Sequence, residues 1–289
     1  MTRRAPLHSA ALARLIVLLL CLGGCRSAPP SVSPDPSASS VGAAPLEQEQ
    51  ESAAASPSVP TPAEPPTLGP LRAHFLGAPA STATRVAVLL HGYGDRGDGL
   101  VALGSDLVRA RPGLAAVALE ARLPRPEGGR MWWPIDIERV RAARLRGEWP
   151  QLSRERPVGA DEARDAVVLA LRALADQGVQ REQVVLAGFS QGAMLAVDVG
   201  LAHPELLGAV VAWSGAIIDR EHWEQRAAPG VRFVVAHGQR DTVLPFSEGE
   251  ALHSLLRNID AGARWVPFDG PHTVSAEGRA ALLELLAGP

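Results

Sequence analysis

Short apolar runs alternate along the chain with segments whose apolar residues recur every three or four positions, from about Leu71 onward. Runs that are apolar throughout are typical of parallel strands covered on both faces. The alternation predicts an α/β domain with a mostly parallel central sheet and helices on both faces. The predicted strands are Arg85–Leu90, Leu114–Leu119, Gln183–Phe189, Ala209–Trp213, Arg232–Ala236 and Arg264–Phe268, with an edge strand near Leu71–Leu76.

The clearest predicted helix covers Asp161–Gln177. Its Ala, Val and Leu residues return every three or four positions, and Gly178 follows as a stop signal. Such spacing places one apolar stripe against the sheet. Further helices are predicted at Gly99–Ala110, Gln191–Ala202, Phe246–Asp260 and Ser275–Leu286.

The N-terminal segment has the pattern of a secretory signal. Arginines precede the apolar run Leu15–Leu22, which is too short to span a bilayer comfortably, and small residues follow it. Leu22–Cys25 resembles the lipobox of bacterial lipoproteins, in which the Cys is acylated and becomes the mature N-terminus. We therefore expect a signal peptide over residues 1–24 and export with a lipid anchor on Cys25. With no Asp after Cys25, the outer membrane is favoured; a plain signal peptide cleaved near Gly24 or Ala28 is the alternative.

The next segment, residues 25–70, is rich in Pro, Ala, Ser and Glu and poor in aliphatic residues. Such a composition cannot bury enough apolar surface to fold, and its prolines favour extended chain. It predicts a disordered tether, with a Pro-rich ligand for a partner domain as the alternative. We expect residues 71–289 to form one folded α/β domain.

Composition excludes several kinds of chemistry. Lys+Arg is 28 and no Lys occurs, which removes Schiff-base and lysine-nucleophile mechanisms. The net charge is −3 without a basic block, so nucleic acid is not expected as a partner. Both cysteines lie in the signal segment, and no His-Glu-x-x-His motif or carboxylate cluster is present. We expect no catalytic metal and no cofactor.

A Gly-x-Ser-x-Gly motif stands at Gly188–Gly192, directly after a predicted buried strand and directly before a predicted helix. This context is that of a sharp strand-to-helix turn that exposes the Ser190 hydroxyl above the sheet. Side chains at positions 188 and 192 would collide with neighbouring backbone, so glycine is needed there. A Gly-rich turn with an incidental serine is the alternative.

A serine hydroxyl needs a nearby base that is itself oriented by an acid, and on this kind of turn the chain order is Ser, acid, His. Asp241 and His272 each lie on a loop just past a predicted strand, and we assign them as acid and base. The other acids considered lie in less suitable places, and the other histidines keep a structural interpretation. These are Asp219, Asp260 and Asp269, and His203, His222, His237 and His253.

Negative charge on the tetrahedral intermediate needs preorganised donors. The main-chain amide of Gln191 is one candidate. The second is the amide of Tyr93, in the Gly-rich segment His91–Asp95 that follows an early strand. The alternative interpretation of His91–Asp95 is a simple turn.

Together, His91–Asp95, Gly188–Gly192, His237–Pro245 and Gly270–His272 resemble the phospholipase/carboxylesterase family, which includes the acyl-protein thioesterases. The resemblance covers nearly all of residues 71–289. It implies an α/β-hydrolase fold and serine esterase chemistry, with no cofactor. It also implies roles for five residues: Ser190, Asp241 and His272 as the triad, and Tyr93 and Gln191 as oxyanion donors.

The chain departs from the family pattern at the doubled Trp132–Trp133 and at the Arg-rich segment Arg139–Arg156. We hypothesise that both tryptophans wall the acyl site and narrow it to small or medium acyl groups. Ordinary packing of a long loop is the alternative. The arginines are interpreted as a solvated face and not as a site for an anionic substrate.

The sequence thus predicts a membrane-tethered serine carboxylesterase that acts on small-molecule or lipid esters or thioesters. Two alternatives stay open. A peptidase or a polymer esterase could use the same triad, because fold and triad leave the leaving group undefined. A surface lipoprotein could have kept the fold for binding alone.

Overall fold

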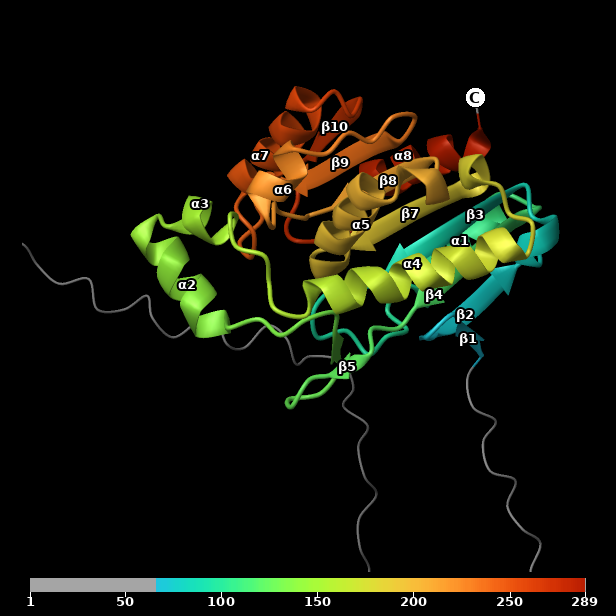
Figure 1. Ribbon diagram of the computed structural model, residues 1–289, viewed down its shortest axis with the longest axis horizontal. Coiled ribbons are helices and arrows are strands. Elements are labelled where there is room, and N and C mark those ends of the chain that lie inside the picture. Colours follow the sequence, from blue (N-terminus) through green and yellow to red (C-terminus); the bar gives the residue numbers. More distant parts are fainter. Residues whose placement is uncertain (1–65, 289) are drawn as a thin grey trace, which may run out of the picture. The chain divides into compact units, whose positions relative to one another are not determined.

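The computed structural model describes residues 66–288. The signal peptide, Cys25 and most of the predicted tether lie outside these residues. The described chain is built on an eight-stranded sheet in the order β1-β2-β4-β3-β7-β8-β9-β10 (Figure 1). Six neighbouring strands of this sheet run parallel: β4, β3, β7, β8, β9 and β10. Strands β1 and β2 are antiparallel to their neighbours. This is the mostly parallel sheet that the alternating pattern predicts.

The predicted strands are all present, with boundaries shifted by at most a few residues. The parallel strands at the centre are buried except at some of their end residues because helices cover both faces. The strand bounds are β1 Thr67–Leu68, β2 Leu71–Gly77, β3 Arg85–Leu90, β4 Leu114–Leu119, β7 Val184–Phe189, β8 Ala209–Trp213, β9 Arg232–Gly238 and β10 Ala263–Phe268.

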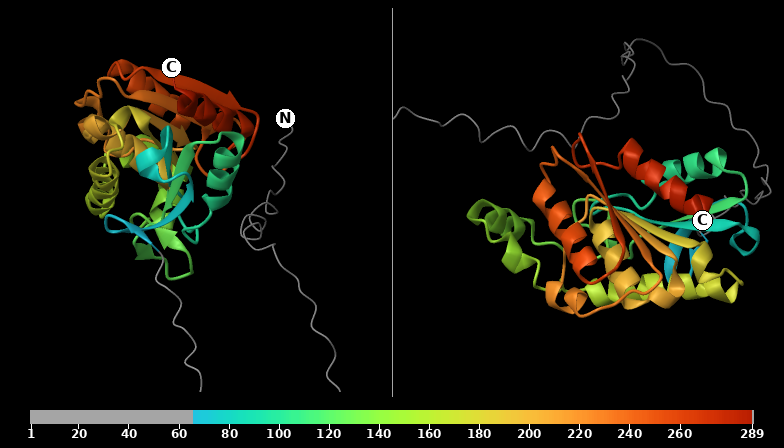
Figure 2. Two further views of the ribbon diagram at one scale, coloured as in Figure 1. Left: turned by 90° about the vertical axis from the view of Figure 1, so that its right-hand side faces the viewer. Right: turned by 90° about the horizontal axis from the view of Figure 1, so that it is seen from above.

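Two apolar cores lie on opposite faces of the sheet. In β3, Val86 and Val88 enter one core and Ala87 and Leu89 the other, as alternating side chains must. Helices α4, α5 and α7 cover the first face, and α1 and α8 cover the second (Figure 2, right). Their bounds are α1 Val101–Ala110, α4 Ala160–Asp176, α5 Gln191–Ala202, α7 Phe246–Asn258 and α8 Ala276–Ala287.

Several elements were not expected from the sequence. Strand β1 lies within the range predicted for the tether, so the folded region starts before Leu71. The others are the hairpin of β5 Leu123–Pro124 and β6 Arg130–Met131, helices α2 Ile137–Arg146, α3 Trp149–Leu152 and α6 Arg220–Glu224, and the 3₁₀ turns Ala80–Thr82, Arg181–Gln183 and Pro204–Leu206.

Helices α2 and α3 form an insert that lies beyond the carboxyl ends of the parallel strands (Figure 1). Helix α2 begins at Asp136, whose side chain accepts a hydrogen bond from the Arg139 amide, and ends at Gly147 with φ 71°. An Asp N-cap is a strong signal for the start of a helix, and a glycine with positive φ is a strong signal for its end. The segment is therefore a helix although it has almost no apolar stripe. Among residues 66–288, no helix has the length and apolar character needed to cross a bilayer.

Ser275 is the N-cap of α8, and its Oγ accepts a hydrogen bond from the Gly278 amide at 3.0 Å. Ser275→Ala removes this bond, and we expect the free energy of unfolding to fall by about 1 kcal/mol. Urea titration followed by circular dichroism measures the change. Ser254→Ala, on the exposed side of α7, is the matched control; equal losses in both variants would contradict the capping role.

Candidate active site

The backbone at Ser190 has a positive φ of 54°, with ψ −114°. A non-glycine residue there is strained, and such strain is held only where the surroundings fix it. Strand β7 ends at the residue before and α5 begins at the residue after. The Ser190 amide donates a hydrogen bond to the Trp213 carbonyl of β8 at 2.9 Å. This is the sharp turn that the Gly-x-Ser-x-Gly motif predicts.

The two glycines of the motif stand where no side chain fits. A Cβ at position 188 would lie 2.0 Å from the carbonyl oxygen of Gly192, and a Cβ at position 192 would lie 2.2 Å from that of Leu90 in β3. Both obstacles are backbone atoms, which cannot move aside. The serine turn is therefore packed against its own helix and against the central strand next to it.

The predicted acid and base form a close pair. Nδ1 of His272 lies 2.6 Å from Oδ2 of Asp241. The other carboxylate oxygen, Oδ1, accepts hydrogen bonds from the amides of Val243 and Leu244, both at 2.8 Å. The Asp241 side chain is fully buried, and that of His272 is 14% exposed. The acid is thus fixed by two amides of its own loop and held against one edge of the imidazole.

Burial alone acts to raise the pKa of Asp241. Hydrogen bonds from His237, His272 and the Leu244 amide act in the opposite direction and prevail, so the pKa of this carboxyl lies well below its usual range. Asp241 is therefore ionised at every pH at which an esterase is normally assayed.

His272 lies beside the nucleophile turn. Its ring centroid is 4.8 Å from that of Phe189, the residue before Ser190. Within residues 66–288 no hydrogen bond joins Ser190 to His272. Catalytic hydrogen bonds are often long in ligand-free enzymes and shorten when substrate binds. The structure thus pairs the acid with the base and places the base next to the serine turn.

The His91–Asp95 segment follows β3 and lies against the serine turn, because a Cβ at Gly92 would be 3.5 Å from Cβ of Ser190. Hydrogen bonds to the β5–β6 hairpin hold it there: the Gly94 amide donates to the Arg130 carbonyl at 2.8 Å, and the Arg130 amide donates to the Asp95 carbonyl at 2.6 Å. The Arg125 guanidinium also lies over the Tyr93 ring, 4.8 Å from its centroid.

The two amides predicted as oxyanion donors are free to bind a ligand. In the described chain neither the Tyr93 nor the Gln191 amide donates a hydrogen bond to another residue. Gln191 is the first residue of α5, where amides have no partner within the helix and where the helix dipole favours negative charge. Both amides therefore have the properties that an oxyanion site needs.

His91 is a buried residue that sequence reasoning did not single out. Its Nε2 accepts a hydrogen bond from the Ala121 amide at 3.0 Å, so its Nδ1 carries the proton and donates to the Gly92 carbonyl at 2.8 Å. Burial lowers the pKa of His91 and outweighs the opposing bond to Gly92. The neutral ring thereby fixes the peptide next to Tyr93.

The side chain of Gln191 holds both tryptophans. The Trp132 amide donates to Gln191 Oε1 at 2.9 Å, and Gln191 Nε2 donates to the Trp133 carbonyl at 2.8 Å. Trp132 Nε1 also donates to the His91 carbonyl at 2.9 Å. Both tryptophans are buried, at 3% and 2% exposure. Their role as walls of an acyl site stays a prediction; the observed contacts link the His91–Asp95 segment to the start of α5.

Comparison with known proteins identifies the family of this chain. The Phospholipase/Carboxylesterase family model matches residues 72–277. The chain belongs to the phospholipase/carboxylesterase family. Acyl-protein thioesterase 1 of Eremothecium gossypii is 30% identical over 182 residues, which cover 62% of this chain and 75% of that protein.

Solved structures are similar over most of the described chain. Esterase PE8 superposes with a TM-score of 0.63 at 33% identity and covers 75% of this chain and 98% of its own. A carboxylesterase from Mesorhizobium loti has a TM-score of 0.59 at 22% identity, covering 76% and 95%, which supports the fold alone. The fold of this phospholipase/carboxylesterase family member is that of an α/β-hydrolase.

The Arg-rich insert of this family member has two parts. Arg139 and Arg146 are exposed and pair with Glu155 and Glu148, as expected for a solvated face. For Arg156 that expectation is wrong. Its guanidinium reaches the buried carboxylates of Asp198 on α5 at 2.9 Å and of Asp219 at 3.0 Å. A buried pair of acids needs a cation. The sequence of α5 does not indicate that Arg156 supplies this cation.

The competing acids and histidines are engaged elsewhere. Asp219 contacts His222 and Arg156, Asp269 pairs with Arg240, and Asp260 lies in the turn after α7 with φ 56°. His203 pairs with Glu205, and His253 contacts the Ala263 carbonyl. His237 differs from the rest because its Nε2 lies 3.3 Å from Asp241 Oδ2.

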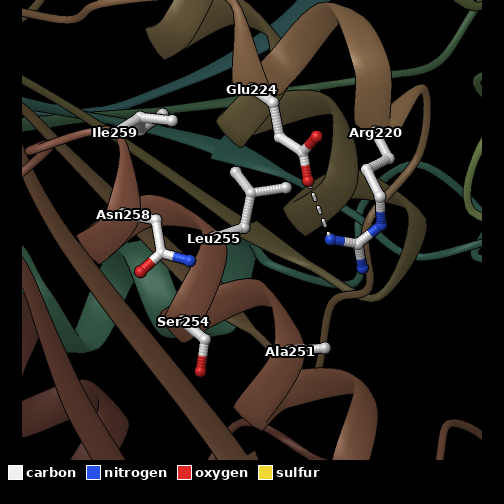
Figure 3. A pocket seen from close by; sticks show the side chains of 7 residues that line it. All are labelled: Arg220, Glu224, Ala251, Ser254, Leu255, Asn258 and Ile259. Carbon is white, nitrogen blue, oxygen red and sulfur yellow. Dashed lines mark hydrogen bonds and ion pairs between the residues drawn. The ribbon is translucent and has the colours of Figure 1, made fainter.

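A cleft of about 300 Å³ lies between α6 and α7 (Figure 3). Arg220 and Glu224 line it from α6 and form an ion pair across one turn of helix. None of the candidate catalytic residues lines this cleft. Within residues 66–288 no cluster of three or more metal-ligating side chains is present.

Gln191→Met tests the link between the nucleophile helix and the tryptophans. Methionine keeps the side-chain volume but leaves the buried Trp132 amide and Trp133 carbonyl without partners. We expect the free energy of unfolding to fall by about 2–4 kcal/mol in urea titration. Gln177→Met, at the exposed end of α4, should change it by less than about 0.5 kcal/mol. A loss no larger than that of the control would show that the two hydrogen bonds contribute nothing.

Proposed function

We propose that this protein is a serine carboxylesterase in which Ser190 is the nucleophile, His272 the general base and Asp241 the orienting acid. The observation that carries the proposal is the 2.6 Å contact between Asp241 and His272 beside a strained serine turn. A buried carboxylate on one ring nitrogen leaves the other nitrogen of His272 unprotonated and able to accept a proton from serine.

In the first half of the reaction, Ser190 Oγ attacks the ester carbonyl carbon while Nε2 of His272 takes the hydroxyl proton. The carbonyl oxygen becomes an oxyanion, which the Tyr93 and Gln191 amides stabilise by hydrogen bonds. The intermediate then collapses and its bond to the alcohol or thiol breaks. His272 gives its proton to the leaving group, and the acyl group stays on Ser190.

In the second half, water replaces the alcohol. His272 takes a proton from water as its oxygen attacks the acyl carbon, and the same two amides receive the second oxyanion. Collapse breaks the bond to Ser190 Oγ, His272 returns the proton to that oxygen, and the carboxylic acid leaves. Ionised Asp241 stabilises the imidazolium in both halves. Every step uses side chains and main-chain amides of this chain.

The names of the relatives support the substrate class that we propose. Their names describe esterases, carboxylesterases and acyl-protein thioesterases, so we propose carboxylic esters and thioesters as substrates. The buried Trp132–Trp133 pair adjoins the His91–Asp95 segment. We propose that it limits the acyl group to small or medium size, with small-molecule or lipid esters as the source.

Ser190→Ala should lower kcat/KM for p-nitrophenyl butyrate by more than about 10³-fold, because no alcohol remains to form the acyl-enzyme. A fluorophosphonate probe should label the parent on the peptide that contains Ser190 and leave the variant unlabelled. Asp241→Asn should cost roughly 10³–10⁴-fold. The matched control is Asp269→Asn on the neighbouring loop, where the side chain is 72% exposed.

Several outcomes would contradict this proposal. Label on another residue would overturn the nucleophile. Loss of activity in Asp269→Asn but not in Asp241→Asn would overturn the acid. Faster cleavage of p-nitroanilides than of p-nitrophenyl esters would favour a peptidase, and a folded parent that is neither labelled nor active would favour a binding protein.

We further propose that the enzyme is exported and lipid-anchored through Cys25, in the outer membrane where the cell has one. The proposal rests on the signal pattern and on the segment Leu22–Cys25. The proline-rich segment before β1 would then link the anchor to the catalytic domain.

Metabolic labelling with a clickable fatty acid tests the anchor. The parent should carry the label and sediment with membranes, whereas Cys25→Ser should carry none, because serine offers no thiol for diacylglycerol transfer. Cys21→Ser is the matched control and should stay labelled. Equal labelling of parent and Cys25→Ser would contradict an anchor at this residue.

A further inference from the structure

His237 is a buried histidine that the proposed reaction does not use. It lies near the end of β9, and its side chain has no exposed surface. Nε2 is 3.0 Å from the Leu244 carbonyl and 3.3 Å from Asp241 Oδ2. Both neighbours are acceptors only, so Nε2 must carry the proton and donate it.

The other ring nitrogen is closed off by helix α7. Nδ1 is buried and has no hydrogen-bond partner in the described chain. A Cβ at Gly249 of α7 would lie 2.5 Å from Nδ1, so only glycine leaves room for the ring. A proton on Nδ1 would be a buried donor without an acceptor, which is costly. The ring is therefore held as a neutral donor whose N–H faces the Asp241 loop.

The Asp241 carboxylate, His272, His237 and Leu244 are linked by a ring of contacts. Oδ2 of Asp241 lies between Nδ1 of His272 at 2.6 Å and Nε2 of His237 at 3.3 Å. Leu244 donates its amide to Oδ1, and its carbonyl accepts from His237. His237 thus touches both the carboxylate and the loop that supplies the carboxylate with amide donors.

We propose that His237 is a positioning residue of the active site, which holds Asp241 Oδ2 in place and takes up part of the negative charge that Asp241 presents to His272. The proposal rests on the function proposed above, because it assigns to His237 control over the basicity of the catalytic base. The hydrogen bond from His237 also contributes to the low pKa of Asp241.

Removal of the His237 N–H should shift the pH dependence of activity in a direction that can be measured. Oδ2 would carry more uncompensated negative charge, which favours the imidazolium form of His272. The base would then become neutral only at higher pH, and the acid limb of the pH profile would move upward. The other charged groups around the loop are Glu248 on α7, Arg144 on α2, and the Arg240–Asp269 pair; all stay unchanged in the variants.

The experiment compares three replacements of His237. His237→Gln keeps an N–H donor near the position of Nε2, His237→Met removes it, and His237→Asn keeps a buried amide that is too short to reach Asp241. His253→Met is the matched control, since His253 lies on α7 with its ring against the Ala263 carbonyl and the Trp265 ring. Circular dichroism and urea titration identify the folded variants; if His237→Met does not fold, His237→Asn takes its place.

We expect His237→Met and His237→Asn to move the acid limb of kcat/KM for p-nitrophenyl butyrate upward by about 0.5–1 pH unit. The rate at the plateau should fall on the order of tenfold, a part of what general base catalysis contributes. His237→Gln should return the limb to within about 0.2 unit of the parent, and His253→Met should not move it. An unmoved limb in the folded donor-less variants would overturn the proposal, as would a His237→Gln limb equal to theirs.

A second readout does not depend on activity. The ring C–H resonances of His272, assigned by their loss in His272→Gln, should titrate at a pH higher by the same amount in the donor-less variants. An unchanged NMR titration would overturn the role of His237 even if the parent is an active esterase. A parent that hydrolyses no ester, with an NMR titration that shifts as expected, would instead overturn the proposed function and leave this contact to Asp241 intact.

Discussion

The close approach of three backbone segments at Ser190 is the constraint on which the rest of this structure depends. Strand β7, helix α5 and the end of β3 meet so tightly that a single added Cβ at Gly188 or Gly192 would overlap a carbonyl oxygen. The parallel sheet holds that approach, because β3 and β8 flank β7 and are buried on both faces. The positive φ of Ser190 is stable only inside this frame. The same frame places Gln191 at the first position of α5, where its amide has no partner within the helix.

The second constraint on the fold is that the buried carboxylate of Asp241 needs hydrogen-bond donors. Asp241 has no exposed side-chain surface, and an ionised carboxylate in such a place needs several donors. The chain provides two amides from the same loop and two histidines from different strands' ends. Because His237 and Asp241 are four residues apart, the strand that delivers the acid also delivers one of its donors. The donors of Asp241 are therefore in place before any substrate arrives.

How much was visible in the sequence differs between parts of the molecule. The parallel strands were predicted closely because burial on both faces makes them apolar throughout, and the Ser, Asp, His order places the site residues at strand ends. Helix α2 was missed because its arginines hide any stripe, although Asp136 and Gly147 are a cap and a stop that mark its ends. The contact of Arg156 with Asp198 joins residues 42 positions apart. No local pattern carries such a contact, since each partner alone resembles an ordinary surface charge.

The insert of α2 and α3 contacts both the loop of Asp241 and helix α5, which follow different strands of the sheet. At one point Arg144 donates to the Thr242 and Val243 carbonyls, within the loop whose amides bind Asp241. At its end Arg156 binds Asp198 on α5, the helix that begins next to Ser190. The Arg156 contacts are buried on the acidic side and are hard to break without leaving a charge unpaired, whereas the Arg144 contact is exposed and is screened by water. A change in the insert's sequence near Arg144 therefore alters the surface of the acid loop at low cost, while a change near Arg156 acts on the nucleophile helix.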